Sequence, residues 1–123
     1  MTSSKKIIML VEDDTLLNEL YTNLLTKKGY DVVSVKDGET AVEKIKQGSW
    51  DLVLLDVVLP GISGFEVFSK ITKPTKPSYP IYFLTNLDSN DKDKKQLEQA
   101  AGYWIKSNMS PPDFLQKVKE VLK

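Results

Sequence analysis

The chain has 123 residues, of which 17 are lysine or arginine and 17 are aspartate or glutamate, so its formal net charge at pH 7 is zero. It has no cysteine and no histidine, which excludes disulfides, Ser-His triads and metal sites with thiolate or imidazole ligands. A metal would need oxygen ligands, which favours magnesium, calcium or manganese. The length fits one domain over residues 1–123, and the balanced charge argues against a nucleic acid or a membrane as a partner. No apolar stretch has the length of a signal peptide or membrane span, so we expect a cytoplasmic domain.

The first half of the chain alternates between apolar runs and helical patterns. The run at 7–11 is apolar throughout, as in a strand buried on both faces. Leucines and a tyrosine then recur at helical spacing over 16–25. A second strand is predicted at 32–35, followed by a helix that Asp37 caps. The third apolar run, at 52–55, is the third predicted strand.

The second half continues this alternation. The segment from Ser63 to Glu66 reads as a capping box that opens a helix. The inward residues of that helix are expected to be Phe65, Phe68 and Ile71. Several prolines then favour an extended connector before a fourth strand at 81–84.

The last third of the chain contains one weak helix and one strong one. A helix is predicted over 89–101, but its apolar support is only Leu97 and two alanines, so we expect it to be held weakly. A fifth strand follows at 103–105. The final helix begins at Ser110, with proline in its first turn and Asp113 at its third position.

Strands that alternate with helices imply right-handed crossovers and a parallel α/β sheet covered on both faces. The ligand site of such a sheet lies at the carboxyl ends of its strands. The polar residues at these ends are Glu12, Asp13, Asp14, Asp56, Thr85 and Lys106. We therefore predict carboxylates, a hydroxyl and an ammonium in one shallow pocket.

This set of side chains suits one chemistry. Clustered carboxylates repel one another, and a divalent cation relieves the repulsion. Lys106 and the hydroxyl of Thr85 could then meet the oxygens of a phosphoryl group, with Asp56 as the nucleophile that forms an aspartyl phosphate. Each residue alone has a plainer interpretation, as a helix cap, a turn former, a strand end or a surface lysine. Their conjunction at the strand ends favours the shared site.

At this point the sequence resembles the receiver domain of two-component response regulators, a flavodoxin-like family that includes the chemotaxis response regulator. The motifs that carry the resemblance are Val11-Glu12-Asp13-Asp14, Asp51 to Asp56 with Leu59-Pro60-Gly61 and Gly64, Leu84-Thr85, and Tyr103-Trp104-Ile105-Lys106. Each is weak alone, but their order and spacing are specific and cover essentially the entire chain. The resemblance implies a three-layer, doubly wound (βα)5 fold with five parallel strands in the order 2-1-3-4-5.

The resemblance also implies a role for each site residue. Asp56 matches the phosphoacceptor, and Glu12 and Asp13 match the acidic pair that holds magnesium, for which manganese can substitute. Val58 matches the residue whose backbone carbonyl binds the metal. Thr85 and Lys106 match the residues that bind the phosphoryl oxygens. In the family, Thr85 and the aromatic at Tyr103 form the switch that reports phosphorylation.

The implied function is signalling rather than enzymatic turnover. A sensor histidine kinase or a histidine phosphotransfer protein would donate the phosphoryl group. The surface formed by the helix at 89–101, the strand at 103–105 and the final helix would then bind an effector protein or output domain. A phosphorylation-dependent homodimer is a further option for that surface. The chain is compatible with a stand-alone receiver and with one cut from a longer regulator.

Three positions depart from the family pattern. Ser107 follows the lysine where proline is usual, Asn86 follows the threonine where a small residue is usual, and Gln99 stands where glycine is common. We also hypothesise that apolar Val58 and Leu87 orient attacking water poorly, which would give a long-lived phosphoryl group.

Three alternative functions can be compared with the residues present. A binding module of the same fold that no longer signals by phosphorylation would agree with Ser107 and Asn86 but leaves the acidic set unexplained. A flavodoxin-like cofactor binder is disfavoured, because Glu12 to Asp14 would repel a phosphate from the first loop. A phosphatase with two aspartates spaced by one residue has no support, since Val57 and Val58 follow Asp56.

Overall fold

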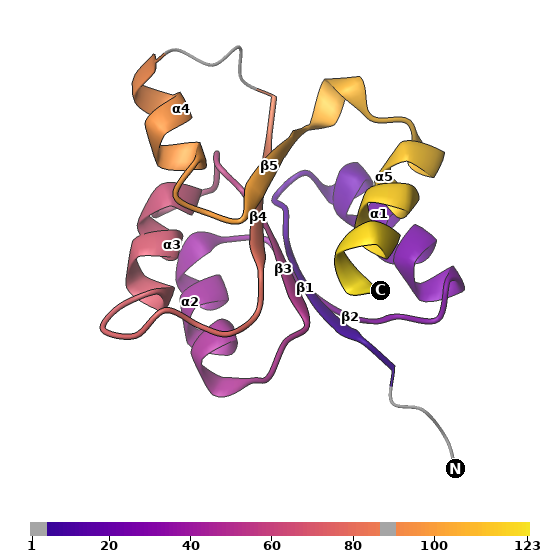
Figure 1. Cartoon of the computed structure of the whole chain (residues 1–123), viewed down its shortest axis with the longest axis horizontal. Helices are drawn as coiled ribbons and strands as arrows, with labels where there is room; N and C mark the ends of the chain where they lie inside the picture. Colours follow the sequence, from indigo (N-terminus) through magenta and orange to yellow (C-terminus); the bar gives the residue numbers. More distant parts are fainter. Residues whose placement is uncertain (1–4, 87–90) are drawn as a thin grey trace.

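In the computed structural model, which describes residues 5–86 and 91–123, one five-stranded parallel sheet lies between two layers of helices (Figure 1). The strands are β1 (Ile7–Val11), β2 (Asp31–Val35), β3 (Leu52–Asp56), β4 (Ile81–Thr85) and β5 (Gly102–Ile105). Their order, β2-β1-β3-β4-β5, confirms the predicted topology. Helices α1 (Thr15–Lys27) and α5 (Pro111–Leu122) cover one face of the sheet. The other face is covered by α2 (Gly38–Gln47), α3 (Gly64–Ile71) and α4 (Asp91–Leu97).

The sheet divides the core into two apolar clusters, one on each face. In β1, Met9 and Val11 join the cluster under α2 and α3, while Ile8 and Leu10 join the cluster under α1 and α5. All four side chains are fully buried. The continuous apolar run therefore reflects a central strand covered on both sides, as predicted.

Side-chain caps fix where three helices begin. Asp37 accepts a hydrogen bond from the backbone N–H of Thr40, and Ser63 accepts one from Glu66. Ser110 and Asp113 form a reciprocal capping box at the start of α5. These polar residues satisfy backbone donors that have no partner within the helix, so the predicted starts of α2, α3 and α5 are confirmed.

Helix α4 is shorter than the sequence predicts. The helix ends at Leu97 rather than near residue 101, and the predicted start at Ser89 lies outside the described residues. The backbone N–H groups of Gln99 and Ala100 donate to carbonyls three residues back, which tightens and closes the last turn. Ala101 N–H then donates to Ile81 O, 3.0 Å away. The chain therefore begins to pair with β4 at Ala101, a residue that the sequence pattern had assigned to the helix.

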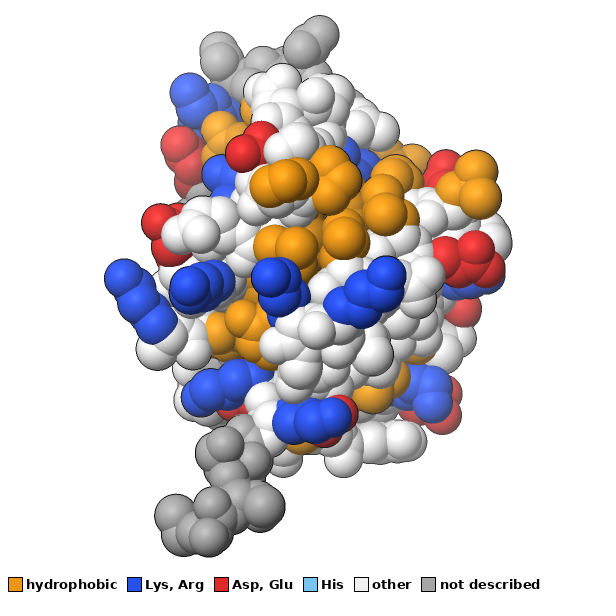
Figure 2. All heavy atoms as spheres, turned by 90° about the vertical axis from the view of Figure 1, so that its right-hand side faces the viewer, with side chains coloured by type: hydrophobic (Ala, Val, Ile, Leu, Met, Phe, Trp, Pro, Cys, Tyr) orange, Lys and Arg blue, Asp and Glu red, His pale blue; other side chains and the backbone are white. Residues whose placement is uncertain are grey.

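The face of the molecule covered by α1 and α5 is partly apolar. Figure 2 shows apolar side chains gathered on this face beside a row of lysines. On α1, Leu16 is 78% exposed and Leu20 is 42% exposed. The leucines of this helix therefore extend beyond the side of the helix that is buried. Every helix of the described residues is too short or too polar to cross a lipid bilayer.

Candidate functional site

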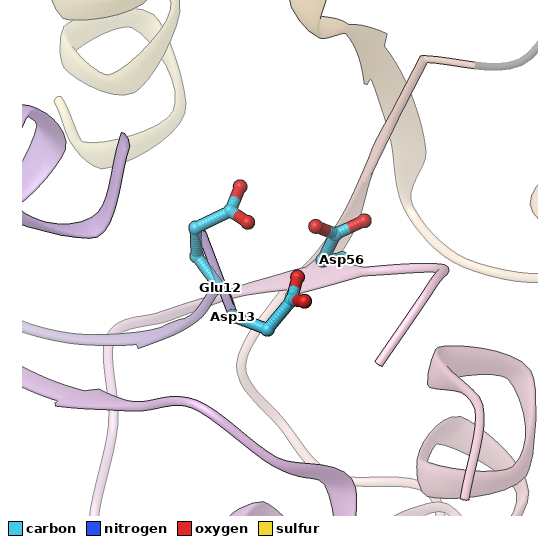
Figure 3. Close-up of side chains that lie close together, drawn as sticks. All are labelled: Glu12, Asp13 and Asp56. Atoms are coloured by element: carbon cyan, nitrogen blue, oxygen red, sulfur yellow. The ribbon is translucent and has the colours of Figure 1, made fainter. Parts of the chain in front are cut away.

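Three carboxylates converge at the carboxyl end of the sheet. Glu12 and Asp13 directly follow β1, and Asp56 is the last residue of β3. The two strands are parallel neighbours in which Val11 pairs with Leu55, so the residues that follow are brought together. One carboxylate oxygen of each residue lies within 4.8 Å of the others. Figure 3 shows the three side chains rising from the strand ends toward the same region.

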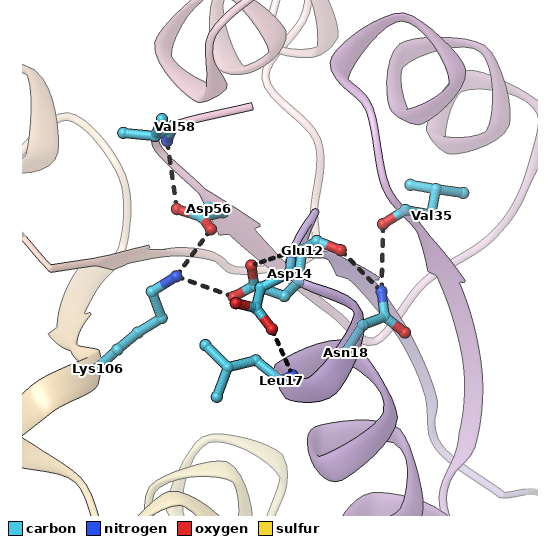
Figure 4. A network of polar contacts seen from close by, with 8 residues as sticks. All are labelled: Glu12, Asp14, Leu17, Asn18, Val35, Asp56, Val58 and Lys106. Carbon is cyan, nitrogen blue, oxygen red and sulfur yellow. Dashed lines mark hydrogen bonds and ion pairs between the residues drawn. The ribbon is translucent and has the colours of Figure 1, made fainter. Parts of the chain in front are cut away.

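Lys106 binds two of these carboxylates. Its Nζ lies 2.9 Å from Glu12 Oε1 and 2.8 Å from Asp56 Oδ2 (Figure 4). Burial alone would lower the pKa of Lys106, but the hydrogen bonds and charges of Asp56 and Glu12 outweigh it and raise the pKa above its ordinary value. Lys106 is therefore a fixed positive charge that joins the end of β5 to the ends of β1 and β3.

Glu12 is the most perturbed acid of the cluster. Its side chain is fully buried, and burial is the main reason that its pKa rises from 4.5 to about 7. The hydrogen bond and the charge of nearby Asp56 raise it further, whereas Lys106 and the N–H of Asp14 act in the opposite direction. A buried carboxyl beside a like charge is poorly stabilised as an anion, so a second cation near Glu12 would be favourable.

Asp14, for which a helix cap was the plainer interpretation, and Asn18, which had no predicted role, hold the acidic loop in place. The backbone N–H of Asp14 donates to Glu12 Oε2 at 3.1 Å, and Asp14 Oδ1 accepts from the N–H of Leu17 to cap α1. Asn18 is buried and its side chain donates to Glu12 O at 2.9 Å and Val35 O at 3.5 Å (Figure 4). Asn18 lies one helical turn before Tyr21 on the buried side of α1. A polar residue on that side is the sequence signal that could have identified it.

The loop that follows β3 ends close to where it begins, because Gly64 lies against Asp56 and Val57. The N–H of Val58 donates to Asp56 Oδ1 at 3.2 Å, and the N–H of Gly64 donates to Val57 O at 2.8 Å. A Cβ atom on Gly64 would lie only 2.0 Å from Asp56 O. The approach therefore requires glycine, and it fixes the loop that carries Val58 against the end of β3.

Most of the predicted site residues line one pocket of about 320 Å³. The lining residues are Glu12, Asp13, Asp14, Leu17, Asp56, Val58, Asn86 and Lys106. Val58 is 66% exposed at the rim. Lys106 and Ser107 belong to a 3-10 turn, Lys106–Asn108, that follows β5 directly.

The two predicted switch residues lie beside the pocket rather than in its wall. Thr85 is the last residue of β4 and is 2% exposed. Tyr103 pairs with Phe83 and Ile105 pairs with Thr85, so all four side chains project to the same face of the sheet. Tyr103 is half-buried against the core on the α3 side. Leu87, the other residue in our hypothesis on water, lies outside the described residues.

The donor set fits magnesium. Glu12, Asp13 and Asp56 offer only oxygen atoms, two of the three are buried, and the pocket is open enough for water to complete a shell. Magnesium prefers one or two carboxylates together with waters and phosphate oxygens. The arrangement can thus hold a divalent cation next to a carboxylate nucleophile and a lysine.

Two proteins of known structure have the same fold as this chain and a similar sequence. The response regulator protein TrrA from Thermotoga maritima, solved in complex with Mg²⁺-BeF, is 34% identical, with 95% of this chain and 99% of that one covered and a TM-score of 0.83. The BeF3-activated N-terminal receiver domain of Klebsiella pneumoniae RstA is also 34% identical, with coverage of 96% and 99% and a TM-score of 0.83.

Two curated relatives match this chain over different lengths. The polar-differentiation response regulator DivK of Brucella anthropi is 25% identical over 118 residues, which are 95% of this chain and 96% of DivK. The uncharacterized transcriptional regulatory protein YcbL of Bacillus subtilis is 47% identical over 58 residues, which are 47% of this chain and 26% of YcbL. The match thus spans about a quarter of the length of that longer regulator.

The family model described as the response regulator receiver domain matches residues 8–119. This segment contains the sheet apart from Ile7, the first residue of β1, together with the acidic cluster and Lys106. The chain therefore belongs to the response regulator receiver domain family of two-component signalling systems.

Proposed function

We propose that residues 1–123 form a single receiver domain in which Asp56 accepts a phosphoryl group from a phosphohistidine of a partner protein. The observation that carries this proposal is the convergence on Asp56 of a buried lysine and two further carboxylates. These 123 residues contain no histidine, which is consistent with a donor histidine on a histidine kinase or a histidine phosphotransfer protein.

The transfer exchanges one bond to phosphorus for another. A carboxylate oxygen of Asp56 attacks the phosphorus, the P–N bond breaks, and its electron pair stays on the histidine ring of the donor. Asp56 is held for this attack from both sides, because Oδ2 accepts from Lys106 and Oδ1 accepts from the N–H of Val58. Both donors are in place to bind the oxygens of the product acyl phosphate.

Glu12, Asp13, Asp56 and the backbone carbonyl of Val58 would hold magnesium. The metal would supply positive charge that offsets the charge gathering between the carboxylates and the phosphoryl oxygens. The Mg²⁺-BeF complex of TrrA supports this assignment. Manganese, which also prefers oxygen ligands, is expected to substitute.

The phosphorylated state would be reported through Thr85 and Tyr103. Thr85 ends the strand next to Asp56, and Tyr103 lies on the same face of the sheet in the neighbouring strand. We infer that Thr85 shifts toward the phosphoryl group and that the ring of Tyr103 follows inward. The surface of α4, β5 and α5 would change with it and bind an effector, an output domain or a second copy of the chain.

The donor is expected to approach across α1. Leu17 lines the pocket, and Leu16, the preceding residue of α1, is largely exposed. An exposed apolar surface next to a reactive carboxylate suits a protein that must place its histidine there. The reaction changes only Asp56 of this chain, so the domain is a signalling component rather than an enzyme with turnover, and we expect it to act in the cytoplasm.

The test is mass spectrometry after incubation with acetyl phosphate, with magnesium or with EDTA. We expect one added phosphoryl mass that requires magnesium, that is absent in Asp56→Asn, and that persists in Asp31→Asn, an exposed aspartate at the other end of the sheet. A folded protein that gains no mass under any condition would contradict the proposal. It would favour the alternative, a receiver fold that binds its partner without phosphorylation.

A further inference from the structure

The first turn of α2 lies directly against the loop that carries Val58. The N–H of Gly38 points at Pro60 O at 3.5 Å. A Cβ atom at Gly38 would lie 2.5 Å from Ile62 O and 2.6 Å from Ile62 Cγ1. Because the nearest atom is a backbone oxygen, no side-chain rotation could make room for it. The helix can therefore pack this closely only with glycine at position 38.

The next residue of α2 covers the same loop. A Cβ atom on Gly61 would lie 2.5 Å from Glu39 Oε1, so the side chain of Glu39 packs over Gly61. The base of the loop is fixed separately by the bond from Gly64 N–H to Val57 O. Residues 57–63 are thus held at their base by α3 and on their outer side by α2.

We propose that Gly38 is a positioning residue for the phosphoacceptor site, although it lines no part of the pocket. The braced loop sets the direction of the Val58 N–H, which binds Asp56 Oδ1. The same peptide region carries the Val58 carbonyl, to which the proposed function assigns a metal-binding role. A side chain at position 38 would push Ile62 outward and move the loop that presents both groups. This inference rests on the proposed function for its effect on the metal.

The test compares Gly38→Ala with Gly48→Ala, a substitution at the opposite end of the same helix. A Cβ atom at Gly48 would also meet a close contact, the Trp50 ring at 2.7 Å, but far from the site loop. We expect Gly38→Ala to weaken magnesium affinity by about tenfold in calorimetry, as loss of an indirect support for a metal ligand typically does. It should also shift the amide NMR signals of Val58 and Gly61 in the metal-free protein. Gly48→Ala should change neither.

The outcomes separate this inference from the proposed function. If both variants keep the magnesium affinity of the unsubstituted protein, or lose it equally, the positioning role is wrong. If the unsubstituted protein neither binds magnesium nor becomes labelled by acetyl phosphate, the proposed function fails, while the amide shifts still show whether Gly38 sets the loop. Labelling of Gly38→Ala should recover at saturating magnesium, because the displaced loop lowers affinity rather than removing the nucleophile.

A second variant covers the case in which Gly38→Ala does not fold. Glu39 is exposed, so Glu39→Ala should fold, yet it removes the side chain that covers Gly61. We expect a loss of magnesium affinity in the same direction and a shifted Gly61 amide signal. Glu39→Gln, which keeps the shape but not the charge, should retain the amide position. Unchanged Gly61 signals in Glu39→Ala would overturn the proposed bracing.

Discussion

In the proposed reaction, Val58 places an apolar side chain where water would attack the acyl phosphate. Its N–H binds Asp56, and its side chain is 66% exposed at the pocket rim. A valine cannot orient a water molecule, so we predict that Val58→Asn speeds dephosphorylation by roughly tenfold, the effect of about 1.4 kcal/mol in the transition state. The decay of the labelled protein, followed by mass spectrometry, measures this rate.

The exposed valine of β2 supplies the control. Val33 is 37% exposed and lies in the outermost strand, away from the pocket, so Val33→Asn should leave the decay unchanged. Equal decay rates in all three proteins would show that the side chain at position 58 does not limit access or orientation of water.

Glu12 should make the stability of the metal-free protein depend on pH. Its pKa in the folded state is about 7, above the value of 4.5 for an ordinary glutamate. Between these values the folded state binds more protons than the unfolded state, so the contribution of Glu12 to stability is present below about pH 4.5 and is lost as the pH rises through about 7. The free energy of unfolding in urea with EDTA should therefore fall more steeply from pH 5 to pH 8 in the unsubstituted protein than in Glu12→Gln. Parallel curves for the two proteins would contradict the raised pKa.

The same carboxyl group should couple magnesium binding to pH. A metal ligand must lose its proton, so metal affinity rises with pH where that ligand titrates. Magnesium affinity should increase from pH 6 to pH 8, with proton release detectable as a buffer-dependent heat in calorimetry. In Glu12→Gln, this part of the pH dependence should disappear.

At the level of helices and strands, the elements with strong local signals were predictable. Continuous apolar runs located the buried strands, and Asp37, Ser63 and Ser110 marked the helix starts because each satisfies free backbone donors. The end of α4 could not be predicted, since it depends on Ala101 pairing with Ile81 in β4. The exposure of Leu16 could not be predicted either, because leucine is a good helix former whether or not it is buried.

Helix α4 should open more readily than the helices on the other face. Among its side chains that the structure describes, only Leu97 is buried, whereas α1 buries three residues and α5 buries Phe114 and Val118. Few buried apolar contacts allow local opening at low free energy. We predict that the amides of residues 95–97 exchange with deuterium much faster than those of residues 21–25, as measured by NMR. Equal protection in the two helices would show that α4 is held by contacts other than burial of its side chains.

At the scale of the whole molecule, the site exists only because distant segments meet. Lys106 lies 94 residues from Glu12 and 50 residues from Asp56 in the chain. The strand-helix alternation was enough to predict that their strand ends meet at one edge, but not which carboxylates the lysine would bind. Nor could it reveal Gly38, whose role depends on how α2 packs against the site loop. Asn18 had one sequence signal, a polar residue on the buried side of α1.

Lys106 should therefore contribute to stability as well as to phosphoryl binding. Lys106→Met keeps a flexible chain of similar length but leaves Glu12 and Asp56 without their shared cation. Removing one partner of a buried ion pair typically costs about 3–5 kcal/mol, and we expect a loss of that order at pH 8 in EDTA. The loss of stability should be smaller at pH 5, because Glu12 is then protonated. It should also be smaller in magnesium, because the metal can neutralise the negative charge of the same carboxylates.

Urea unfolding of both proteins at the two pH values, with EDTA or magnesium, measures these differences. Lys119→Met, at an exposed lysine of α5, should behave as the unsubstituted protein does. A loss that is the same at pH 5 and pH 8 and insensitive to magnesium would mean that Lys106 acts through packing alone. A loss that magnesium reverses would mean that lysine and metal serve the same carboxylates, so that the charges holding three strand ends together are also those that prepare Asp56 for phosphorylation.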